Sequence, residues 1–159
     1  MTAPGATGPH HPAVPLAAAP RSERVWLSLM FLAAVLLVAG TFLPWIRSGT
    51  VWRNSYEVWQ SADRLGVIEG RPAETLHLVW FLLPLGAAGL LVAVALDRPR
   101  LSAGLAGVMG ALAVLGAVVA LIAPLPTGAG PSVTLLGGIV LLAAAVGNLV
   151  SLGRRRTVT

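Results

Sequence analysis

The sequence predicts an all-α integral membrane protein, a bundle of four transmembrane helices with a Trp-rich outer loop. The first observation is composition: the 159 residues are 56% hydrophobic and only 11% charged. Soluble domains carry about 25% charged residues, so this chain cannot supply an ordinary charged shell. The second observation is that the apolar residues gather in four long stretches without Asp, Glu, Lys or Arg.

Each of the four stretches is long enough to cross a membrane, which takes about 20 helical residues. They cover residues 25–46, 75–96, 101–123 and 132–152. All are apolar around the whole helix, whereas a helix of a soluble bundle shows a polar stripe. We therefore expect one transmembrane domain over residues 23–152. A cleaved signal peptide is disfavoured for the first stretch, because its apolar run is too long and a tail precedes it.

The arginines predict how the chain is oriented. Residues 1–22 are rich in Pro, Ala and Gly and are predicted to be a disordered tail, and residues 153–159 form a basic tail. Arginines flank both tails and the turn at 97–100, while those of the outer loop 47–74 are nearly balanced by carboxylates. The positive-inside rule then places both termini in the cytoplasm, in a multi-pass protein of the plasma membrane.

The outer loop carries tryptophans at regular spacing, at Trp45, Trp52 and Trp59. A single helix through all three is excluded because Pro44 and the Ser-Gly-Thr at 48–50 interrupt it. Trp52 falls in a short β-prone segment. Trp59 falls on a predicted amphipathic helix over 55–65, which Asn54 and Glu57 begin as a capping box.

Aromatic residues converge on this loop and on the start of the second stretch, where a kink at Pro84 is expected to open space beneath them. We predict that they form a collar at the outer surface that contacts lipid or a partner. A plainer interpretation is an aromatic belt that only sets membrane depth. The candidate contact residues are Trp45, Trp52, Tyr56, Trp59, His77 and Trp80.

The sequence predicts no catalytic, cofactor-binding or metal-binding residue. Glu74 and His77 have the Glu-x-x-His spacing of di-metal bundles, but the other spans offer no further ligands. There is no Cys, and the arginines sit at segment ends, which argues against a nucleic-acid partner. The loop carboxylates, Glu57, Asp63, Glu69 and Glu74, leave an outer-leaflet membrane enzyme as one alternative.

Small residues on the third and fourth stretches indicate close helix packing, for example Ala103, Gly107 and Ala111, then Gly137 and Gly138. These faces could meet within the chain, in a protein partner or in a homo-oligomer. The favoured function is a non-catalytic accessory or interaction subunit in contact with membrane lipid. A carrier or channel for a small or lipid-like molecule is a second alternative, disfavoured because no ionisable residue lies deep in any span.

Four short motifs carry a resemblance. They are Leu43-Pro44-Trp45, Ser48-Gly49, the segment 53–57 and Gly130-Pro131. In these motifs the chain resembles a group of uncharacterised, small four-span membrane proteins of actinobacteria. The resemblance implies four spans and an outer loop, and it implies no activity.

Overall fold

The computed structural model describes residues 21–64 and 71–156, and the chain is mostly helical. Its helices are α1 Arg21–Phe42, α2 Ser55–Arg64, α3 Arg71–Ala95, α4 Pro99–Ile122 and α5 Ala129–Arg156. Two short strands, β1 Ile46–Ser48 and β2 Val51–Arg53, pair antiparallel.

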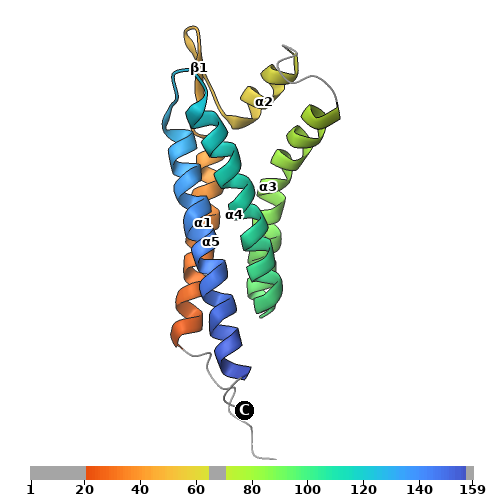
Figure 1. Cartoon of the computed structure of the whole chain (residues 1–159), viewed down its shortest axis with the longest axis vertical. Helices are drawn as coiled ribbons and strands as arrows, with labels where there is room; N and C mark the ends of the chain where they lie inside the picture. The colour runs from red at the N-terminus through yellow and green to blue at the C-terminus, as the bar shows by residue number, and fades with distance from the viewer. Residues whose placement is uncertain (1–20, 65–70, 157–159) are drawn as a thin grey trace, which may run out of the picture.

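The long helices run side by side along the molecule (Figure 1). Helix α5 packs against both α1 and α4, and α3 packs against α4. The hairpin β1–β2 and helix α2 lie at one end of the bundle, which we call the hairpin end. Helix α1 begins and α5 ends at the opposite end, together with the turn between α3 and α4, and we call this the termini end.

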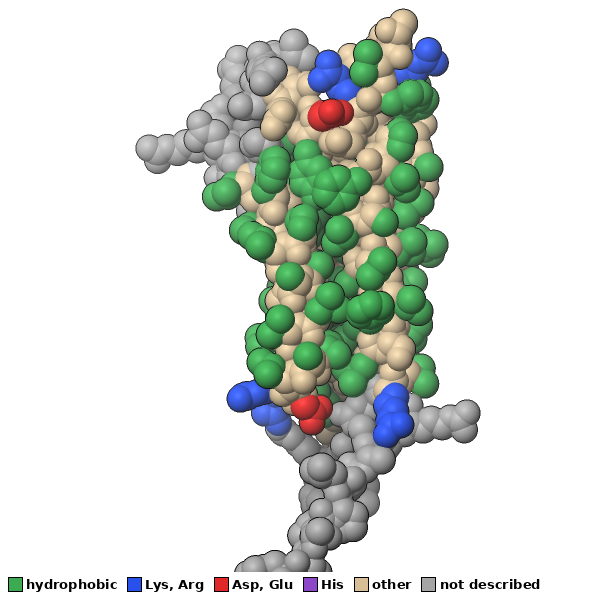
Figure 2. Space-filling view, turned by 180° about the vertical axis from the view of Figure 1, so that it is seen from behind, with side chains coloured by type: hydrophobic (Ala, Val, Ile, Leu, Met, Phe, Trp, Pro, Cys, Tyr) green, Lys and Arg blue, Asp and Glu red, His purple; other side chains and the backbone are tan. Residues whose placement is uncertain are grey.

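Three helices, α1, α4 and α5, are long and apolar enough to span a membrane, and α3 adds a shorter apolar helix, Trp80–Ala95. Many large apolar side chains are exposed along these helices, among them Leu32, Leu85 and Ile122. Figure 2 shows a broad band of hydrophobic side chains between two ends that carry the charged side chains. Helix length and hydropathy thus define a multi-span membrane protein.

The hairpin is the main departure from the predicted all-α fold. The first helix ends at Phe42 instead of continuing to residue 46. The reason is Pro44, whose ring disfavours helical geometry at Leu43 and which has no N–H to donate. The chain leaves the helix there and becomes β1, so Trp45 lies just after α1 and not on it.

Glycines on α5 allow its two neighbours to approach closely. A Cβ added at Gly137 would lie 2.8 Å from the Leu37 nitrogen of α1, and one at Gly138 would lie 3.0 Å from the Gly110 oxygen of α4. Gly147 likewise faces the Trp26 indole. Such backbone contact is how helices gain van der Waals energy in lipid, where the hydrophobic effect does not drive association. The face of α4 that carries Gly110 therefore meets α5 within the chain, whereas Gly107 of the predicted stripe has nothing within 4 Å of its would-be Cβ and Ala111 is exposed.

Candidate functional site at the hairpin end

The hairpin is a tight turn in which Ser48 pairs with Val51 across two residues, Gly49 and Thr50. Gly49 has a φ of 62°, and Thr50 does not have a positive φ. Only glycine adopts this conformation readily, and a positive φ at the first central position alone is the pattern of a type II′ turn. The resulting tip, residues 47–52, is exposed.

The hairpin is attached to the start of the last helix. The Arg47 nitrogen donates to the Pro126 oxygen at 3.0 Å, and the Gly128 nitrogen donates to the Trp45 oxygen at 2.8 Å. The Gly130 nitrogen donates to the Pro44 oxygen at 2.8 Å. Each of these bonds satisfies a backbone group that would otherwise lie unpaired at the edge of the bundle. The loop between α4 and α5 thus fixes the position of β1.

Trp45 is an internal side chain with only 1% of its surface exposed. Its Nε1 donates to the Gly40 oxygen of α1 at 2.9 Å, and its ring lies against Gly130 of α5. The ring also meets Trp80 of α3 edge-on, with centroids 5.3 Å apart. Trp45 therefore ties α1, α3 and α5 together at the hairpin end, and its indole is not available to lipid.

Ser55 is the centre of a buried hydrogen-bond network. Its Oγ accepts from Trp80 Nε1 at 3.0 Å and donates to the Thr41 oxygen at 2.7 Å. Ser55, the first residue of α2, is fully buried, and Trp80 is 4% exposed. The Trp80 ring packs on Gly116 of α4, where an added Cβ would collide with it. One serine thereby joins α1, α2 and α3.

Tyr56 extends this network toward the side of the bundle. The Thr41 hydroxyl donates to the Val38 oxygen at 2.7 Å, so its contact of 3.1 Å with the Tyr56 hydroxyl is one in which Tyr56 donates. The Tyr56 ring lies between those of Phe42 and Phe81, with centroids 5.2 and 4.9 Å away. Burial of the phenol raises the pKa of Tyr56 above its usual value of 10.0.

The predicted capping box is confirmed at the start of α2. The Glu57 nitrogen donates to Asn54 Oδ1, and the Asn54 nitrogen donates to Glu57 Oε2, both at 3.0 Å. Arg53 Nη1 donates to Ser61 Oγ at 2.8 Å, which joins β2 to α2. Glu57 is thus engaged in positioning the helix, and the side chains of Asp63, Glu69 and Glu74 lie outside the described residues.

The remaining predicted contact residues, Trp52, Trp59 and His77, do not share one environment. Trp59 is half-buried on α2 with its ring centroid 6.0 Å from that of Trp80, and its buried Nε1 has no hydrogen-bond partner within residues 21–64 and 71–156. Trp52 is 46% exposed on the hairpin, with the Arg47 guanidinium 5.9 Å from its ring centroid. The side chain of His77 lies outside the described residues.

Beneath the aromatic cluster, α3 continues through Pro84 without interruption. An apolar groove of about 420 Å³ opens between α1 and α3 at this level, with Val38, Ala39, Pro84 and Ala88 among its lining residues. No group of three His, Cys, Asp or Glu side chains that could hold a metal occurs among the described residues. The groove therefore offers apolar contact, and the cluster above it offers hydroxyl and indole groups that are mostly paired.

Sequence reasoning did not assign the structural roles of the residues that organise this end, namely Gly40, Thr41, Ser55, Gly116 and Gly130. One signal was available in the sequence: Thr41 is a hydroxyl near the end of an apolar stretch, and such a group needs a partner. The role of Ser55 could not be predicted, because a serine just after an N-cap is common at helix starts and does not by itself indicate a buried hydrogen bond. The partner glycines lie far away in the sequence, so only the fold brings them together.

We expect Ser55→Ala to destabilise the protein by about 1–3 kcal/mol, because it leaves the buried Trp80 N–H without an acceptor. Thermal unfolding of detergent-purified protein measures this change. The matched control is Ser61→Ala on the same helix, whose hydroxyl contacts Arg53 and the Glu57 oxygen near the surface. We expect about 0.5 kcal/mol or less for this control. Equal losses for the two serines would contradict the central role of Ser55.

Tyr56 is the only tyrosine, so its ionisation can be followed directly by tyrosinate absorbance. We expect the folded protein to ionise at higher pH than the denatured chain, because burial of the phenol disfavours the anion. The linked stabilisation is fully present below the unfolded pKa of about 10 and is lost as pH rises through the folded pKa. Coincident titration curves for folded and denatured protein would contradict the burial.

The helices and the hairpin end together define a multi-span membrane protein with a small folded cap. No family model matches the sequence, no curated protein matches it, and no solved structure matches it. The resemblance to small four-span actinobacterial proteins therefore stays a hypothesis carried by short motifs.

Proposed function

We propose that the chain is a four-span protein of the plasma membrane with a non-catalytic, accessory role, whose cap at the hairpin end holds a protein partner outside the cell. Four spans are supported by α1, α4 and α5 together with the apolar part of α3. An even number of spans agrees with α1 beginning and α5 ending at the same end of the bundle (Figure 1). Arg24, Arg98 and Arg154 at the termini end favour the cytoplasm for that end.

The observation that carries the accessory role is the exposed tip of the hairpin. Val51 is 57% exposed and Trp52 is 46% exposed. Both lie on β2, which pairs with β1, and β1 is hydrogen-bonded in turn to the loop after α4. Exposed Trp and Arg side chains on a rigid support are the residue types that dominate binding energy at protein interfaces. In contrast, the polar groups beneath the hairpin, Ser55 and Thr41, are engaged in holding the cap to the helices.

Site-specific photo-cross-linking in cells tests this role. A photoreactive residue placed at the exposed Thr50 should give one discrete protein adduct, and the same residue at the exposed Leu85 of α3 should not. Trp52→Ala should lower the adduct yield by about 30-fold, the effect of losing a hot-spot residue worth about 2 kcal/mol. Adducts that are equal at Thr50 and Leu85, or that persist unchanged in Trp52→Ala, would contradict the proposal.

The orientation has its own test, since the chain contains no cysteine. A single Cys at Thr50 should react with a membrane-impermeant thiol reagent in intact cells. A Cys at Gly5 or a reporter fused at Thr159 should show cytoplasmic behaviour, because most unbalanced arginines lie on that side. Labelling at position 5 from outside would reverse the proposed topology.

A further inference from the structure

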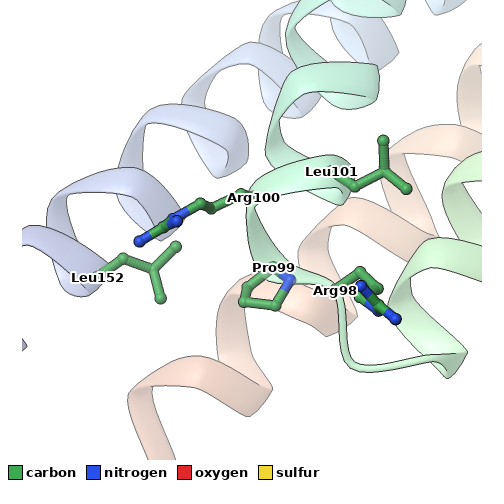
Figure 3. A pocket seen from close by; sticks show the side chains of 5 residues that line it. All are labelled: Arg98, Pro99, Arg100, Leu101 and Leu152. Atoms are coloured by element: carbon green, nitrogen blue, oxygen red, sulfur yellow. The ribbon is translucent and has the colours of Figure 1, made fainter.

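The termini end holds a second feature, a hollow of about 430 Å³ where the turn between α3 and α4 meets α5. Its lining residues are Arg98, Pro99, Arg100, Leu101 and Leu152. Figure 3 shows Arg98 and Arg100 on either side of Pro99, with the Arg100 side chain extending beside Leu152 of α5. Two cations and two leucines therefore border one space.

The walls of this hollow are fixed by hydrogen bonds. Just beyond the end of α3 at Ala95, Asp97 has a φ of 52°, and the Arg98 nitrogen donates to the Ala93 oxygen at 2.9 Å. This is the pattern of a Schellman motif, which holds the turn in one shape. Asn148 of α5 is fully buried, and its Nδ2 donates to the Pro99 oxygen at 3.0 Å. The turn and α5 are thus joined directly behind the hollow.

The charge of this corner favours an anion. Arg98 and Arg100 are exposed, and Asp97 is the one carboxylate in the turn. Helix α4 begins at Pro99 with no side-chain cap on its first turn and with no acidic residue there. The partial positive charge of the helix start therefore adds to the field of the two guanidinium groups.

The apolar walls decide which anion fits. Leu101 is 56% exposed, and Leu96 and Leu149, just before the turn and on α5, are 66% and 49% exposed. The hollow is thus bordered by exposed apolar side chains as well as by arginines. A soluble anion would use the arginines and leave the leucines in water. A phospholipid would place its phosphate at the arginines and its acyl chains against the leucines.

We propose that this hollow binds the phosphate of an anionic phospholipid of the cytoplasmic leaflet, with Arg98 and Arg100 as its cationic contacts and Leu101 and Leu152 as contacts for the acyl chain. Basic pockets between transmembrane helices on the cytoplasmic side are suited to such headgroups. The inference needs the membrane orientation proposed above, but it does not need a partner at the hairpin.

Native mass spectrometry of the detergent-purified full chain tests the site with phosphatidylglycerol and phosphatidylcholine as probes. We expect the protein to retain phosphatidylglycerol in preference to phosphatidylcholine. The double variant Arg98→Gln/Arg100→Gln should weaken phosphatidylglycerol binding by about 30-fold, since each arginine near a headgroup contributes roughly fivefold. Leu101→Glu, which places a carboxylate in the hollow, should also remove the preference.

The matched control is Arg21→Gln/Arg24→Gln, which removes the same charge from helix α1, which begins at the same end of the bundle. We expect the control to retain the preference for phosphatidylglycerol. Equal losses in the two double variants would overturn the site in favour of general charge attraction. Competition by millimolar inorganic phosphate would assign the hollow to a soluble anion and overturn the lipid. Either failure would leave the Thr50 cross-link unchanged, so the two proposals fail separately.

Discussion

Replacing Trp45 by alanine is expected to destabilise the protein by about 3–5 kcal/mol, the usual cost of removing a large buried aromatic side chain. Trp45 is 1% exposed, contacts Trp80 edge-on and donates to the Gly40 oxygen. The alanine variant loses all three interactions and leaves a cavity between α1, α3 and α5. Unfolding of the detergent-purified protein by heat or by denaturant measures this loss of stability.

Two control variants distinguish a Trp45 indole that is packed inside the protein from one that only sets membrane depth as part of an aromatic belt. Trp45→Phe keeps most of the apolar volume but leaves the Gly40 oxygen without its donor, so we expect a loss of about 1–3 kcal/mol. Trp52→Ala, at a side chain that is 46% exposed, should change stability by about 0.5 kcal/mol or less. A membrane-belt role for Trp45 would instead make Trp45→Phe nearly silent, and that result would contradict its burial.

The sequence predicted the helices well because their signal is local. Length and hydropathy identify α1, α4 and α5 directly, and the capping box of α2 was readable from Asn54 and Glu57. These features depend on residues within a few positions of one another, so the chain itself displays them. The resemblance, the partners and the orientation stay predictions.

The hairpin end was harder to predict because its contacts join distant segments. Trp45 was expected at the lipid interface, as indoles at the ends of spans often are. Nothing in its neighbourhood shows that Gly130 leaves room for its ring, or that Trp80 contacts Ser55. Likewise, Gly49 and Thr50 indicated in the sequence only that a helix is interrupted. The antiparallel pairing of the strands on either side of them became evident only in the fold.

The same argument applies to the small residues of α4, which look alike in sequence but differ in the structure. Gly110 faces α5, where an added Cβ would lie 2.9 Å from the Gly138 oxygen. Gly104 has nothing within 4 Å of its would-be Cβ and is exposed. A stripe of small residues therefore predicts that close packing occurs somewhere on a helix, but the burial of each member decides which face is used.

Gly138→Leu is expected to have the second large effect, a loss of roughly 3 kcal/mol or more, because the Gly110 backbone oxygen and the short, stiff side chains of Val114 and Ala113 stand in its way. The new side chain would meet the Gly110 oxygen and the Ala113 Cβ, and α4 would have to move away from α5. Gly104→Leu is the matched control, and we expect it to be neutral or slightly stabilising, since leucine is the better helix former. Measuring both variants in the same detergent removes differences in the unfolded reference. If the two glycines respond alike, the close approach of α4 and α5 at Gly110 and Gly138 is wrong, and the small residues of α4 would have to serve another contact.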